Sequence, residues 1–395
     1  MSRRQLFGSL CSMVFLVNMA RVVFAPLLDP LKTTFAVSDA TIGLLATLAW
    51  LGSASPRLPV GYLLTRIARR HVVFASGLVL TAAAAFASVA PSIEVLMVSA
   101  FCLGLSSGAY FIAANPLVSE LFPDRVGAAL GVHGASSQVA AVVAAPFVGL
   151  VLALEDWRLA FQVLAGVAAL ATVVLLVVSR RTDLPDAGIE DRDLVGAAKR
   201  QWRLILAGVA FIGATGLVWN GVFNFYDIYL SSARTLPDGA SRDMLTVLFA
   251  AGLPAFLVSG RLADRLPNVP YVLGICGAFA FCLYLLTLTS GYWEVLAVSA
   301  LMGYVIHSLF PAMDTYMLSS LPDQHRASAY AVYSGSMMFI QAAGSTVIGV
   351  LRDAGFAFDT VFQGAAAALG VVLVVLVGLY LDGRLPTGAA MGDRV

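Results

Sequence analysis

The chain contains two copies of one apolar pattern. Residues 94–100 read Glu-Val-Leu-Met-Val-Ser-Ala, and residues 294–300 repeat this segment with one exchange, 200 positions later in a chain of 395 residues. Other landmarks recur at a shift of 199 residues, and they are Gly61 with Gly260, Gly104 with Gly303, and Pro123 with Pro322. Two homologous halves predict two similar helical bundles joined in one chain.

The composition places these halves in a bilayer. Of all residues, 59% are hydrophobic and 12% are charged, whereas about a quarter of the residues of a soluble protein are charged. The net charge is +1 and no basic run exists, so we expect no nucleic-acid partner. A duplicated apolar chain is typical of transporters that hold a small solute between two half-bundles, near the middle of the membrane.

Breaks at polar and Pro/Gly clusters predict twelve membrane spans, because about 20 apolar residues are needed to cross the bilayer. The predicted spans are 6–28, 40–65, 71–91, 93–121, 127–153, 157–179, 203–231, 242–266, 269–290, 293–321, 327–351 and 356–380. We therefore expect an all-α integral membrane protein of two six-helix repeats with pseudo-twofold symmetry. The expected parts are an N-terminal bundle at 1–180, a cytoplasmic linker at 181–202 and a C-terminal bundle at 203–395.

The positive charges predict the orientation. Most of the 24 lysines and arginines fall in the termini, the central linker and the loops that share their side, and cytoplasmic loops are the ones that retain such residues. We expect a multi-pass protein of the plasma membrane with both termini in the cytoplasm. Two arginines that are assigned to neither side, Arg21 and Arg57, fall inside predicted spans.

The loop after the second span carries a family signature. Gly61-x-x-x-Thr65-Arg66-x-Ala68-Arg69-Arg70 resembles the Gly-x-x-x-Asp-Arg-x-Gly-Arg-Arg motif of the major facilitator superfamily, and Gly260 to Arg265 is its copy. The resemblance covers nearly the whole chain and implies that family's fold and alternating access. Residues matching the motif imply a cytoplasmic latch between conformations, and they are Gly61, Thr65, Arg66, Arg69, Arg70, Gly260, Asp264 and Arg265.

One departure from the motif concerns the latch acid. Thr65 stands where the family has Asp, whereas the copy keeps Asp264 beside Arg265. We expect a weak latch in the N-terminal half, with a Thr65 hydroxyl capping a helix end, and an ionic latch in the C-terminal half. Replacing Asp264 by Asn should then alter the balance of conformations more than replacing Thr65 by Ala.

Arg21 is the first candidate for substrate contact. It lies deep in the first span, three residues after Asn18 on the same helical face, where a charge usually faces a cavity or a partner. Its counterpart is Asn220, and Asn224 and Asp227 continue a polar stripe at i+4 and i+7. Alternatively, Arg21 is the buried partner of Asp227 or of Asp314.

Arg57 is a second candidate for anion binding. The pattern Arg57-x-Pro59-x-Gly61 resembles the second span of nitrate/nitrite porters, in which the matching arginine binds the anion, and an arginine fork suits planar oxyanions. The equivalent C-terminal residue is Phe256, so the paired arginine is missing and nitrate is not supported. Arg57 is equally compatible with closing an inner gate.

The tenth span carries one polar face. Tyr304, His307, Pro311 and Asp314 recur at i, i+3, i+7 and i+10. Asp314 is the preferred proton-coupling residue, with Asp227 as the second, and His307 changes charge near neutral pH in water. The alternative for Asp314 is a fixed counter-ion to an arginine.

Several motifs are absent from the sequence. It contains no phosphate-binding Gly-x-x-x-x-Gly-Lys-Ser/Thr loop, no His-Glu-x-x-His and no Gly-x-Ser-x-Gly, so we expect neither ATP hydrolysis nor enzyme activity, and no metal or cofactor.

The expected function is proton-coupled transport of a small anion by a monomer. Arg21 and Arg57 attract the anion, and Asn220, Asn224 and His307 orient it. The alternatives are proton-driven efflux of an amphipathic cation and a membrane scaffold or sensor without transport.

Overall fold

The computed structural model describes residues 3–64, 66–122, 126–154, 156–180, 194–234, 236, 239–263, 265–322 and 326–386. Within these residues the chain forms seventeen α-helices and no strand. The chain divides into two compact units, Met1–Asp191 and Arg192–Val395. The expected fold class, an all-helical membrane protein of two repeats, is confirmed.

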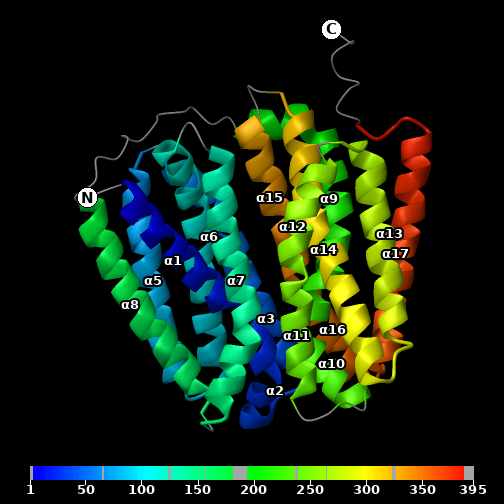
Figure 1. Cartoon of the computed structure of the whole chain (residues 1–395), viewed down its shortest axis with the longest axis horizontal. Helices are drawn as coiled ribbons and strands as arrows, with labels where there is room; N and C mark the ends of the chain where they lie inside the picture. Colours follow the sequence, from blue (N-terminus) through cyan, green and yellow to red (C-terminus); the bar gives the residue numbers. More distant parts are fainter. Residues whose placement is uncertain are drawn as a thin grey trace. The chain divides into compact units, whose positions relative to one another are not determined.

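Helices that run alongside one another build the N-terminal half (Figure 1). Their bounds are α1 Arg3–Val22, α2 Phe24–Phe35, α3 Asp39–Ala54, α4 Arg57–Leu63, α5 Arg69–Ser88, α6 Ile93–Leu121, α7 Val126–Leu152 and α8 Arg158–Arg180. Helix α3 begins at a side-chain cap, in which the Ser38 hydroxyl accepts the Thr41 N–H at 3.3 Å. Helix α1 packs against α6, α7 and α8, so its buried face lies inside this half.

The C-terminal half repeats this order. Its helices are α9 Leu194–Asn224, α10 Tyr226–Ala233, α11 Ala240–Ala250, α12 Gly252–Ala263, α13 Asn268–Leu286, α14 Tyr292–Ser320, α15 Arg326–Ala342, α16 Gly344–Asp353 and α17 Phe358–Leu381. Helix α9 begins inside the segment expected to be linker and contains one non-helical residue, Gln201. Residues 181–193 of that linker lie outside the described residues.

Eleven helical runs in the described residues are long and apolar enough to cross a membrane. The second predicted span is not among them, because Ser55 and Pro56 interrupt it and divide it into α3 and α4. Together these two helices occupy residues 39–63, within two residues of the predicted 40–65. They supply the twelfth span, so the protein is a multi-pass membrane protein.

Several spans are broken near their middle. Helices α1 and α2 are separated at Val23, and α9 and α10 are separated at Phe225. In both cases a candidate polar residue lies within two positions of the break, Arg21 in the first and Asn224 in the second. Backbone groups freed at such a break are tolerated in a membrane only where protein or water satisfies them, so broken helices commonly mark transporter sites.

Two equivalent glycines allow the same helix pair to pack closely in each half. A Cβ on Gly104 of α6 would lie 2.0 Å from the carbonyl oxygen of Ala49 on α3. A Cβ on Gly303 of α14 would lie 2.1 Å from the carbonyl oxygen of Leu248 on α11. Because the obstructing atom is backbone in both cases, only glycine permits these crossings.

Candidate functional site

The deepest charge of the N-terminal half is Arg21, on the last turn of α1. Its side chain is 6% exposed. Nη2 donates a hydrogen bond to Oδ1 of Asn18 at 2.6 Å, and Nη1 donates to Oγ of Ser53 on α3 at 3.1 Å. Asn18 is itself fixed, because its Nδ2 donates to the carbonyl oxygen of Ser137 at 2.7 Å. Asn18 and Arg21 thus lie on one helical face, as their spacing of three residues indicates.

Two aromatic rings cover the guanidinium of Arg21. Its central carbon lies 4.6 Å from the ring centroid of Trp50 and 5.6 Å from that of Phe111, within cation–π range. Its Nε has no hydrogen-bond partner, and among the described residues of the N-terminal half no carboxylate forms an ion pair with it. A guanidinium has five N–H donors, so this charge retains donors for an added acceptor.

Arg57 is the first residue of α4 and is half-buried. It follows Ser53 by four residues and acts on Arg21 as a like charge. Two positive groups in one half raise the local electrostatic potential, which favours a negative ligand. Neither Ser53 nor the ring of Trp50 is recognisable as a partner of Arg21 from sequence spacing, because both lie on α3, a different helix.

The polar stripe expected on the seventh span is divided by the helix break. Asn220 and Asn224 lie together at the end of α9, where Nδ2 of Asn224 donates to the carbonyl oxygen of Asn220 at 2.8 Å. The Oδ1 atom of Asn224 is buried and has no hydrogen-bond partner. Asp227 lies beyond the break on α10, where Nε of Arg242 is 3.6 Å from its Oδ2 and Ser241 donates to its Oδ1.

His307 is enclosed by aromatic rings in the C-terminal half. It is 3% exposed, and its ring centroid lies between 5.5 and 6.2 Å from those of Trp219, Phe249, Phe256 and Phe310. Nδ1 donates to the carbonyl oxygen of Gly303 at 2.7 Å. In the neutral ring Nε2 therefore carries the lone pair and is the acceptor.

Asp314 differs from the candidates for solute and proton binding described above because it is exposed. Its Oδ1 accepts a hydrogen bond from the hydroxyl of Tyr330 on α15 at 2.6 Å. The expected polar face of the tenth span is thus uneven: His307 is buried, Tyr304 and Pro311 are half-buried, and Asp314 is exposed. Tyr330 was not expected from the sequence, since it lies on a different helix, 16 residues further along the chain.

The latch motif is only partly described. Thr65 and Asp264 lie outside the described residues, so the expected contrast between them stays a prediction. Gly61 and Gly260 lie in α4 and α12, and Arg66, Arg70 and Arg265 are exposed. Arg66 donates to the hydroxyl of Tyr62 at 2.6 Å.

Arg69 forms the ionic contact at this end of the N-terminal half. Its Nη1 pairs with Glu120 at the end of α6. At the equivalent positions of the C-terminal half, Nδ2 of Asn268 donates to Oγ of Ser319 at 3.2 Å. The same two helices are therefore joined by an ion pair in one half and by a neutral hydrogen bond in the other.

The sequence is similar to that of characterised transporters. The sequence profile of the Major Facilitator Superfamily matches residues 10–237 and 238–390. The purine ribonucleoside efflux pump NepI of Escherichia coli O6:H1 is 23% identical over 378 residues, covering 92% of this chain and 90% of that protein. The same pump from Salmonella enteritidis PT4 is 26% identical over 377 residues, with the same coverage.

Solved structures share the fold. A bacterial homolog of the human lysosomal transporter Spinster, in an inward-facing and unoccupied conformation, has a TM-score of 0.73 at 17% identity and covers 98% of this chain and 97% of its own. A POT family transporter in complex with a thioalcohol-conjugated peptide has a TM-score of 0.80 at 12% identity, covering 95% and 96%. With two helical repeats, twelve spans and a profile match across both halves, the chain belongs to the major facilitator superfamily.

Proposed function

We propose that this transporter moves a small anion through alternating access and couples the movement to protons. The observation that carries the proposal is Arg21: a buried guanidinium in the first span, donating to neutral groups and forming no ion pair among the described residues of its half. A charge at the centre of a membrane helix costs about 2.5–3.5 kcal/mol on insertion scales. An anionic ligand that accepts from its remaining donors offsets that cost.

The other candidate residues take distinct roles in this proposal. Arg57 adds positive potential, and the amides of Asn220 and Asn224 together with Nε2 of His307 orient the solute. Asp314 is the proton carrier, because an exposed carboxylate that accepts from a tyrosine hydroxyl can exchange a proton with water. Asp227 is the weaker choice, since it is buried and already pairs with Arg242.

The proposal includes a setting in the cell. The distribution of arginines favours cytoplasmic termini in a plasma-membrane protein, and the named relatives are efflux pumps, which favours export. We propose a monomer as the working unit, because each six-helix half packs its own core.

A second candidate is export of a purine ribonucleoside. The named relatives favour it, and so does the aromatic enclosure of His307. Purine bases stack on aromatic side chains with about 1–3 kcal/mol per base, and Nε2 of His307 can bond to a base edge. This solute needs no positive charge, so the two candidates differ in their dependence on Arg21.

Flux in proteoliposomes tests both candidates. Purified protein is reconstituted with an imposed pH gradient, and uptake of labelled inorganic and organic anions is compared with that of labelled inosine. Anion flux that falls at least tenfold in Arg21→Gln, a loss of about 1.4 kcal/mol, supports the first candidate. The exposed Arg203→Gln is the charge-matched control and should retain flux.

The remaining outcomes are equally informative. Inosine flux that survives Arg21→Gln but falls in His307→Phe supports the ribonucleoside candidate. Asp314→Asn should abolish acceleration by the pH gradient while leaving exchange of solute at equal pH. Flux of a cationic dye that needs Asp314 and not Arg21 would instead favour cation efflux and overturn the anion proposal.

A further inference from the structure

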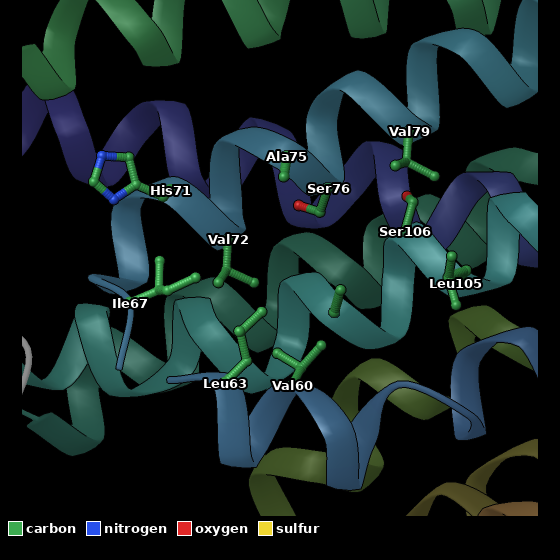
Figure 2. A pocket seen from close by; sticks show the side chains of 11 residues that line it. Val60, Leu63, Ile67, His71, Val72, Ala75, Ser76, Val79, Leu105 and Ser106 are labelled. Carbon is green, nitrogen blue, oxygen red and sulfur yellow. The ribbon is translucent and has the colours of Figure 1, made fainter. Parts of the chain in front are cut away.

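A cavity lies between α4, α5 and α6 of the N-terminal half, apart from the site around Arg21. Its volume is about 320 Å³. The walls are Val60 and Leu63 of α4, Ile67 of the following loop, residues of α5 from His71 to Val79, and residues of α6 from Leu105 to Ala109. Figure 2 shows Val60 and Leu63 on one side and Val72 and Ala75 on the other.

The walls of the cavity suit hydrocarbon rather than a polar solute. Besides His71, its polar lining groups are two serines. The hydroxyl of Ser76 is already bonded to the carbonyl oxygen of Val73 at 2.7 Å. The hydroxyl of Ser106 is buried without a partner, but a helical serine can turn its hydroxyl back to the carbonyl four residues earlier. The interior therefore needs no polar ligand atom.

An arginine and an imidazole lie at the mouth of the cavity. Arg70 and His71 are exposed at the start of α5, and neither has an ion-pair or hydrogen-bond partner through its side chain among the described residues. The exposed Arg66 lies in the preceding loop. Helix α5 also starts without a side-chain cap, since the N-cap residue is Ala68. In the first turn of α5 the backbone N–H of His71 already donates to the carbonyl oxygen of Ala68 at 3.0 Å, and the helix dipole adds positive potential at this end.

An apolar cavity whose mouth carries an arginine, an imidazole and a helix N-terminus is complementary to an amphiphile with a negative head. The lining of α5 runs from His71 to Val79, and eight residues at 1.5 Å each span about 12 Å, which accommodates part of an acyl chain. Exposed apolar residues continue outward from the mouth, with Tyr62 at 56%, Leu63 at 39% and Ile67 at 37%. Exposed apolar surface at a membrane span is the kind of surface that faces a bilayer, and the amphiphile available there is a lipid.

We propose that this cavity binds one acyl chain of an anionic phospholipid, with its phosphate at the start of α5 between Arg70 and His71. The α4 segment, which carries part of the latch motif, forms one wall. A bound lipid therefore holds α4 against α5 in the conformation described. A free phosphate ion would bind at the mouth but would leave the apolar cavity empty. Binding therefore requires both the acyl chain and the phosphate head of the lipid.

The test measures lipid binding to the full-length protein in detergent. Native mass spectrometry counts bound dioleoylphosphatidylglycerol, and thermal unfolding records its stabilising effect, with dioleoylphosphatidylcholine and inorganic phosphate as comparison ligands. The expected result is retention of phosphatidylglycerol, at least tenfold weaker binding of phosphatidylcholine, and no stabilisation by phosphate alone. Arg70→Gln with His71→Gln should weaken binding about fivefold for each charge that the lipid senses.

Substitutions in the cavity wall test binding of the acyl chain separately from binding of the phosphate head. Ala75→Trp fills the cavity and should abolish retention of phosphatidylglycerol. The matched control is Leu78→Trp, on the same helix, which is 52% exposed and does not line the cavity. Ser106→Ala should bind lipid as the unmodified protein does.

Three outcomes would overturn the proposal. They are unchanged lipid retention in Ala75→Trp, equal binding of both lipids by the unmodified protein, and loss of binding in Ser106→Ala. The last result would mean that a polar ligand occupies the cavity. If Ala75→Trp fails to fold, Val79→Phe tests the same wall with a smaller side chain.

Discussion

The two halves present aromatic rings at equivalent positions but enclose different groups with them. The pairs of rings are Trp50 with Phe249 and Phe111 with Phe310, each 199 residues apart. In the N-terminal half they cover the guanidinium of Arg21, on the first span. In the C-terminal half they surround the imidazole of His307, on the tenth span. The two halves thus share the aromatic rings, whereas the polar group that the rings cover lies on the first span in one half and on the tenth span in the other.

Steric contacts explain why the N-terminal half has no side chain at the position equivalent to His307. His307 is equivalent to Gly108, where a Cβ would lie 2.2 Å from the carbonyl oxygen of Ser53. No side chain fits there while α3 approaches α6 this closely. Arg21 in turn is equivalent to Asn220, whose Oδ1 accepts from Ser345 at 3.1 Å. The close approach of α3 therefore excludes from α6 the side chain that α14 carries at the equivalent position.

The largest effect should come from the close helix crossings that the halves share. Gly104→Val and Gly303→Val should each lower the free energy of unfolding by about 2–3 kcal/mol, because the added side chain collides with backbone of a packed neighbour. Thermal unfolding of the purified variants measures this. Gly166→Val is the control, since nothing lies within 4 Å of a Cβ there. If only one of the two variants is destabilised, the two helix crossings are not equivalent in the folded protein.

We expect a smaller effect from conservative substitutions of Arg21 and His307, the two side chains that these rings enclose. Arg21→Lys keeps the charge but loses the planar fork, and should weaken binding of the transported anion about tenfold. His307→Gln keeps a polar group and should weaken it about threefold or less. Titration calorimetry on the purified protein gives both constants. Equal losses in the two variants would contradict the assignment of the charged contact to the N-terminal half.

Substitutions of the aromatic rings should have the next largest effect on anion binding. Trp50→Leu removes a cation–π contact of about 0.5–2 kcal/mol and should weaken anion binding about threefold to tenfold by freeing Arg21. Phe249→Leu, at the equivalent position, should leave anion binding within twofold. The same binding titrations compare the pair. If Phe249→Leu has the larger effect, the solute is recognised in the C-terminal half, as the ribonucleoside candidate requires.

The smallest effect on stability is expected at the end of each half that carries the latch motif. Glu120→Gln removes a partly exposed ion pair with Arg69 and should cost about 0.5–1 kcal/mol of stability at low salt, and less at high salt. Ser319→Ala, at the equivalent position, should cost no more than this and show no dependence on salt. Unfolding at two ionic strengths distinguishes them. Salt dependence of the Ser319→Ala effect would contradict the neutral contact.

The repeat and most of the spans were predictable because membrane helices must be long and apolar. The predicted span 93–121 coincides with α6, and the predicted 157–179 lies within one residue of α8 at each end. Breaks at Val23 and Phe225 were not predicted, since neither residue is a proline or glycine. The segment 194–202 was assigned to the linker on its charges, but a helix with alternating exposure tolerates such residues outside the bilayer.

The candidate site was predictable only within single helices. Asn18 and Arg21 follow from a spacing of three residues on one helix. Ser53, Tyr330 and the enclosure of His307 depend on which helices are neighbours, and spacing does not encode that. Asp227 was expected to extend a stripe along one helix, but the break at Phe225 leaves it beside Arg242 instead.

Sequence by itself determined that this chain is a duplicated helical membrane protein with arginines inside its spans. Hydrophobicity and periodicity are local properties, and a bilayer admits few structures that satisfy them. Only the tertiary structure decided what each deep group touches, and that Asp314 is exposed while Asp227 is paired. Those outcomes depend on close packing between helices, where a backbone carbonyl oxygen that would lie 2.0–2.2 Å from an added Cβ excludes a side chain.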